Sequence, residues 1–126
     1  MNATALRPIL IVDDDEAILS SMELALSDEG YPVVVARNGR DALELARSAS
    51  PRLILLDMKM PVMDGWAFAE AYRSQESQGG ARAPIIAMTA AHDSERQAAE
   101  VAVDGYIAKP FDLNELLDLI LRYSGN

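Results

Sequence analysis

Five short apolar runs alternate along the chain with segments whose apolar residues recur at helical spacing. The runs occupy residues 9–12, 33–36, 53–56, 85–88 and 106–108. The first four contain β-branched residues and show no alternating polar face, which is typical of strands buried on both sides of a parallel sheet. We therefore expect five parallel strands.

The intervals between the runs predict helices. They are marked by helical spacing in the first two segments (Ile18, Met22, Ala25 and Leu26; Ala42, Leu45 and Ala46) and by start signals in the last three (Asp64-Gly65, Ser94 to Gln97, Asp112 to Glu115). Gly30 stands where the first helix should stop. The alternation predicts a (βα)₅ fold of the α/β class, with right-handed crossovers.

Residues with reactive side chains stand at the ends of four predicted strands. Asp13 and Asp14 follow the first, Asp57 the third, Thr89 the fourth and Lys109 the fifth. Parallel strands share one carboxyl edge, where ligands bind at the topological switch point. If the strand order is 2-1-3-4-5, these side chains converge there.

The chemistry of this set is that of a phosphoryl-transfer site. Two carboxylates about 4 Å apart repel each other by roughly 4 kcal/mol at an effective dielectric constant near 20. Such a cluster calls for a bound cation, and its oxygen-only donors suit Mg²⁺ or Mn²⁺. With a lysine and a hydroxyl beside them, one carboxylate can act as the nucleophile toward phosphorus.

Simpler explanations exist for each residue taken singly. Asp14 or Asp15 is well placed to cap the first helix. Asp57 is able to open a turn, and Lys109-Pro110 is compatible with a surface turn. None of these explanations accounts for reactive residues at the ends of four different strands, so we favour a shared site.

Composition limits the alternatives. The 126 residues suit a single domain, 1–126, with a core at about 7–123, and the absence of cysteine excludes disulfides and thiolate chemistry. The formal net charge of −9 disfavours direct binding to nucleic acid or to anionic membranes. The first seven residues lack the apolar segment of a signal peptide, and no run has transmembrane length. We expect a cytoplasmic protein.

Four segments together resemble the receiver domain of two-component response regulators: ILIVDDDEAI, LILLDMKMPVMDGW, IIAMTA and GYIAKPF. The resemblance covers essentially the whole chain and implies a flavodoxin-like doubly wound sheet of order 2-1-3-4-5. It implies that Asp57 is the phosphoacceptor, supplied by a histidine kinase, a phosphotransfer protein or a small phosphodonor. Asp13 and Asp14 correspond to the Mg²⁺-binding acids.

The same resemblance assigns further roles. The backbone carbonyl of Lys59 would be a metal ligand, and Lys109 would pair with a phosphoryl oxygen. Thr89 would bind the phosphoryl group, and Tyr106 would turn inward when Thr89 moves, which changes the face of the fourth helix, fifth strand and fifth helix. The small residue Ala90 would let a donor approach. The peptide before Pro110 is expected to be cis.

Two departures from the family pattern give hypotheses. Ala102 stands where a glycine usually ends the fourth helix, so we expect a shifted helix end there. The side chain of Lys59 is either a solvated surface group or a partner of the site that alters phosphoryl lifetime. The single histidine, His92, is expected to be a solvated loop residue and not a phosphohistidine.

These observations favour a stand-alone receiver that switches the binding of an unidentified output protein. Its only catalysis would be its own phosphorylation and dephosphorylation, and it would be a monomer or a weak homodimer. A receiver module of a multidomain transcription factor would look the same. An Mg²⁺ phosphohydrolase with Asp13 as nucleophile is a further alternative, although the chain has no room for a substrate-capping element. A scaffold that is never phosphorylated is disfavoured, because the key residues are all present.

Overall fold

The computed structural model describes residues 7–58, 63–76, 83–90 and 103–124. Five parallel strands form one sheet in the order β2-β1-β3-β4-β5, which confirms the predicted topology. The strands are β1 (Ile9–Val12), β2 (Val33–Ala36), β3 (Leu53–Asp57), β4 (Ile85–Ala90) and β5 (Gly105–Lys109). The helices within the described residues are α1 (Glu16–Asp28), α2 (Gly39–Ala49), α3 (Gly65–Glu76) and α5 (Leu113–Ser124).

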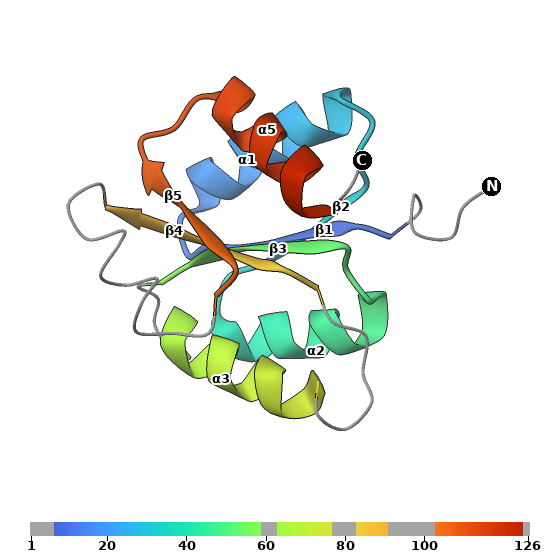
Figure 1. Ribbon diagram of the computed structural model, residues 1–126, viewed down its shortest axis with the longest axis vertical. Helices are drawn as coiled ribbons and strands as arrows, with labels where there is room; N and C mark the ends of the chain where they lie inside the picture. Colours follow the sequence, from blue (N-terminus) through green and yellow to red (C-terminus); the bar gives the residue numbers. More distant parts are fainter. Residues whose placement is uncertain (1–6, 59–62, 77–82, 91–102, 125–126) are drawn as a thin grey trace.

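The sheet is the middle of three layers (Figure 1). Helices α1 and α5 cover one face, and α2 and α3 cover the other. Alternate residues of β1 and β3 pack to opposite sides, as the pleat of a strand requires. Ile9 and Ile11 join the cluster under α1 and α5, whereas Leu10 and Val12 join the cluster over α2 and α3.

Burial differs between central and edge strands in a way that the sequence did not indicate. All residues of β1 and β3 are buried, as predicted for strands covered on both faces. Three of the four residues of β2 are only half-buried, and β5 is largely so. Both lie at the edges of the sheet, where neighbouring strands cover them from one side only.

Three strands continue further than their apolar runs. Asp57 is the last residue of β3, Thr89 lies within β4, and Lys109 is the last residue of β5. Parallel pairing continues because it joins backbone groups and does not depend on side-chain polarity. The reactive side chains are therefore held by the sheet ladder itself and not by the loops that follow it.

The helix signals that fall on described residues are confirmed. Gly30 adopts a φ of 91° after α1, and Asp64 and Asp112 accept hydrogen bonds from Ala67 N and Glu115 N at the starts of α3 and α5. Leu113, the first residue of α5, is 39% exposed, whereas Leu116 and Ile120 of the same helix are buried. The predicted fourth helix lies outside the described residues. No helix among the described residues combines the length and apolar character needed to cross a membrane.

Candidate functional site

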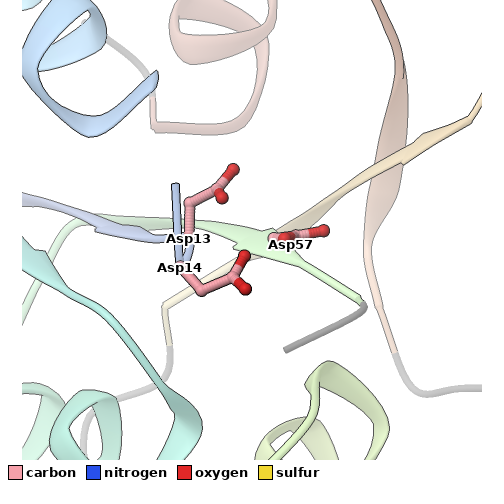
Figure 2. A group of neighbouring side chains, drawn as sticks. All are labelled: Asp13, Asp14 and Asp57. Carbon is pink, nitrogen blue, oxygen red and sulfur yellow. The ribbon is translucent and has the colours of Figure 1, made fainter. Parts of the chain in front are cut away.

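The sheet brings the predicted acids together at its carboxyl edge. Strands β1 and β3 are neighbours, with Val12 opposite Leu56, so Asp13 and Asp57 follow a paired position. Figure 2 shows these two side chains with Asp14 at the ends of the two strands. One carboxylate oxygen from each of the three acids lies within 4.8 Å of the others. The convergence expected from the strand order is thus present.

Burial makes this cluster costly. Asp13 is 1% exposed and Asp57 is 9% exposed, whereas Asp14 is exposed. Buried carboxylates are tolerated only where hydrogen bonds or cations compensate for lost hydration. The hydrogen bonds and cations around these carboxylates therefore need to be identified.

Lys109 supplies the positive charge. It lies at the end of β5, opposite Ala90 of β4, and its Nζ donates to Asp13 Oδ2 at 3.1 Å. The same Nζ lies 3.8 Å from Asp57 Oδ1. The peptide that joins Lys109 to Pro110 is cis, in agreement with the resemblance. One ammonium group thus serves two carboxylates from different strands.

Asp15 is the acid that caps α1. Its Oδ1 accepts hydrogen bonds from Ala17 N at 2.9 Å and from Ile18 N at 3.3 Å. Asp13 Oδ1 accepts from the backbone N of Asp15 at 3.0 Å. Asp14 takes no part in the cap and turns its carboxylate toward Asp57 (Figure 2). Capping and cation binding are therefore divided between neighbouring acids.

Thr89 presents an unusual hydroxyl. The residue is 3% exposed, and its Oγ1 is buried without a hydrogen-bond partner among the described residues. Such a group costs about 1–3 kcal/mol of desolvation. Tyr106, the proposed partner of its movement, is 39% exposed on β5. Ala90 ends β4 at the level of Lys109.

A cavity of about 740 Å³ opens beside Asp57, Thr89 and Lys109. Sequence reasoning missed its other walls, which come from α1, from the ends of β3 and β4, and from the segment after β5. They are Ala17, Ile18, Ser21, Met22, Met58, Met88, Pro110 and Phe111. The helical spacing of Ile18 and Met22 was the available signal, but it gave no indication that this part of α1 lies beside the reactive residues.

An ion pair lies beside the acidic loop. Arg37 follows β2 and binds the carboxylate of Glu16, the first residue of α1, through two hydrogen bonds. The hydrogen bond from Arg37 lowers the pKa of Glu16, and the same contact raises the pKa of Arg37. Both side chains are more than half exposed, so the pair is a surface contact.

The donor set fits a hard divalent cation. Asp13, Asp14 and Asp57 together carry three negative charges, and Lys109 is the only cation that contacts any of them among the described residues. Carboxylate oxygens without histidine or cysteine are the ligands of Mg²⁺. Lys59 and His92, and the helix end predicted at Ala102, lie outside the described residues.

The sequence also matches a known protein family. Residues 9–121 match the family described as "Response regulator receiver domain". The chain belongs to this family. The match spans the whole sheet and every reactive residue discussed above.

A curated relative belongs to the same family of response regulators. Response regulator MprA of Mycolicibacterium vanbaalenii is 42% identical over 111 residues, which are 86% of this chain and 46% of that protein. The chain thus spans about half the length of this relative.

The receiver domain of the sensor histidine kinase PA1611 of Pseudomonas aeruginosa is 32% identical, with a TM-score of 0.84 and coverage of 95% of this chain and 98% of that one. It was solved with a magnesium ion coordinated in its active-site cleft. The receiver domain of Ssk1 from Saccharomyces cerevisiae, solved with the histidine phosphotransfer protein Ypd1, is 25% identical, with a TM-score of 0.87 and coverage of 94% and 88%.

Proposed function

We propose that this receiver domain is a phosphorylation-activated switch in which Asp57 accepts the phosphoryl group. The observation that carries the proposal is the position of Asp57 at the end of β3, with oxygens of Asp13 and Asp14 within 4.8 Å and Lys109 Nζ at 3.8 Å. A carboxylate beside a cation site and a lysine is suited to act as the nucleophile toward phosphorus.

In the proposed reaction, an oxygen of Asp57 attacks phosphorus and forms an acyl phosphate. The phosphorus–nitrogen bond of a donor phosphohistidine, or the phosphorus–oxygen bond of acetyl phosphate, breaks at the same centre. Its electron pair leaves with the donor, and an imidazole donor then takes up a proton. Hydrolysis of the acyl phosphate by water resets the switch.

Asp13, Asp14 and Asp57 would hold Mg²⁺, and the backbone carbonyl of Lys59 is assigned the same role through the resemblance. When bound, Mg²⁺ neutralises charge on the transferring phosphoryl oxygens. The magnesium ion of the related Pseudomonas domain supports this assignment. Mn²⁺ suits the same oxygen donors.

Lys109 is suited to hold the product. Its Nζ already lies beside both Asp13 and Asp57, so an added phosphoryl oxygen gives this ammonium a further charged partner. Thr89 is suited to report it, because its buried hydroxyl lacks a partner among the described residues. Movement of Thr89 toward the phosphoryl group would open space for Tyr106, which now stands partly in solvent.

We further propose that the donor is a histidine kinase or a phosphotransfer protein. The pairing of the similar Ssk1 domain with Ypd1 supports this class of partner. The output would be a protein that binds the face formed by the fourth helix, β5 and α5, with the receiver acting as a monomer or a weak homodimer in the cytoplasm. We keep the prediction of a stand-alone receiver. The greater length of MprA supports the alternative, a receiver module of a multidomain transcription factor.

Incubation with Mg²⁺ and acetyl phosphate tests the proposal. The expected result is a mass increase of one phosphoryl group that maps to Asp57 and is absent in Asp57→Asn. Asp118→Asn, which removes an exposed acid from α5, is the matched control and should be labelled normally. A label on Asp13 would instead indicate a phosphohydrolase. If no acid is labelled, the result would support a scaffold that is never phosphorylated.

A further inference from the structure

The loop between β1 and α1 is short and consists of acids. It contains only Asp13, Asp14 and Asp15 before α1 begins at Glu16. Both oxygens of Asp13 are engaged: Oδ2 by Lys109 Nζ at 3.1 Å, and Oδ1 by the backbone N of Asp15 at 3.0 Å. The orientation of Asp13 therefore depends on an amide that belongs to the third acid.

The side chain of Asp15 fixes where that amide lies. Its backbone is extended, with φ −91° and ψ 110°, as an N-cap requires, while its carboxylate accepts from two amides of the first helical turn. Its own carbonyl accepts from Leu19 N at 3.0 Å. Asp15 thus joins the rigid helix to the loop that carries two of the acids.

We propose that Asp15 is a positioning residue of the cation site. By capping α1, its carboxylate holds the Asp15 amide against Asp13 Oδ1 and presents Asp13 and Asp14 in the geometry that the cation binds. The inference rests on the proposed function, because it presupposes that these acids bind Mg²⁺.

Core packing does not supply this effect. Asp15 is exposed, and α1 is anchored on the sheet by Leu19, Met22 and Leu26, which remain in any Asp15 variant. Loss of the cap should therefore disturb the first turn and the acidic loop while the helix stays in place. Groups that orient metal ligands in this way change metal affinity by 10–100-fold when they are removed.

The test must separate the cap from the negative charge of Asp15, which also attracts a cation. Asp15→Asn, Asp15→Ser and Asp15→Ala all remove the charge, but only asparagine and serine retain a capping oxygen. Binding of Mg²⁺ to the unphosphorylated protein is measured by titration calorimetry at fixed ionic strength. We expect similar dissociation constants for the asparagine and serine variants and a constant about ten-fold larger for alanine.

Asp112→Ala is the matched control. It removes the equivalent N-cap contact of α5, from Asp112 Oδ1 to Glu115 N at 2.9 Å, on a residue that is not among the clustered acids. It should leave Mg²⁺ binding unchanged. If Asp15→Ala fails to fold, Asp15→Gly replaces it, because glycine is tolerated at an N-cap and lacks the capping oxygen.

Equal dissociation constants for the alanine and asparagine variants would overturn the positioning role, because charge alone would then explain the effect of Asp15. A wild-type protein that binds no Mg²⁺ at millimolar concentration would overturn the metal site itself. The two failures are distinguished by the wild-type titration.

Discussion

Polar groups differ in how they are paired at the two ends of the strands, here called the amino edge and the carboxyl edge of the sheet. At the amino edge, where the strands begin, Arg7 donates to the carbonyls of Ser50 and Pro51 at 2.7 and 3.1 Å. Asp104 Oδ2 accepts from Ile85 N at 2.8 Å and from Arg73 at 2.6 Å. Each of these charges is matched by backbone groups or by an opposite charge.

At the carboxyl edge, three acids lie together, the ammonium group of Lys109 contacts two of them, and the hydroxyl of Thr89 lacks a partner among the described residues. Groups that only stabilise the fold are satisfied within it, because an unmet buried group costs stability. At the carboxyl edge the clustered acids outnumber the one ammonium group that contacts them, which is the imbalance that the proposed cation would correct. We therefore expect that removing a matched group lowers stability, whereas removing Asp57 from the acid cluster or the hydroxyl of Thr89 raises it.

The largest expected effect is at the amino edge. Asp104→Ala removes the acceptor of Ile85 N and of Arg73, and hydrogen bonds to charged groups contribute about 1.5–3 kcal/mol each. We expect the free energy of unfolding to fall by about 3 kcal/mol in urea denaturation. Asp118→Ala, on the exposed side of α5, should change it by less than about 0.5 kcal/mol. Equal effects of the two substitutions would contradict the claim that the contacts of Asp104 stabilise the fold.

A change of opposite sign is expected at the carboxyl edge. Asp57→Asn removes repulsion from two neighbouring carboxylates, while Lys109 keeps its shorter contact with Asp13. We expect the free energy of unfolding to rise by about 1.5 kcal/mol in a chelating buffer, because repulsion outweighs the lost attraction to Lys109. Addition of Mg²⁺ should stabilise the wild type more than the variant. A destabilised variant in the chelating buffer would show that the acids are compensated within the fold.

Thr89 allows a similar test with a smaller effect. Thr89→Val replaces the buried hydroxyl by a methyl group of nearly the same shape, so we expect a gain of about 1 kcal/mol in thermal or urea unfolding. In the proposed switch, the same variant should still be phosphorylated on Asp57, because the hydroxyl of Thr89 is not the nucleophile. A loss of stability would indicate that the hydroxyl is hydrogen-bonded in the folded state.

The smallest effect concerns the ion pair of Glu16 and Arg37, which is exposed at the carboxyl edge. The hydrogen bond from Arg37 lowers the pKa of Glu16, so the pair stabilises the fold at neutral pH and loses this effect as pH falls through the lowered pKa. The melting temperature of Glu16→Gln should lie slightly below that of the wild type at pH 7. The difference should vanish at strongly acidic pH and shrink in high salt. Glu23→Gln, an exposed acid further along α1, serves as the control. A difference that persists at strongly acidic pH would show that it does not come from this ion pair.

The apolar runs and their spacing were sufficient to predict the parallel sheet, the helices among the described residues and the five reactive residues at the strand ends. They sufficed because burial on both faces leaves a continuous apolar signal, and because polar residues interrupt it only where the chain leaves the core. The runs did not reveal that β3, β4 and β5 continue through Asp57, Thr89 and Lys109. Backbone pairing decides strand length, and it leaves no mark in side-chain hydrophobicity.

The order of residues along the chain is enough to list the groups of the site: acids after the first and third runs, a hydroxyl after the fourth and a lysine after the fifth. The different roles of these groups follow from the folded arrangement. The three consecutive acids are indistinguishable as letters, yet Asp13 binds Lys109, Asp14 faces solvent beside Asp57, and Asp15 caps α1. The three acids form the short loop between β1 and α1, in which successive side chains point in different directions. Their partners come from segments far away in the sequence.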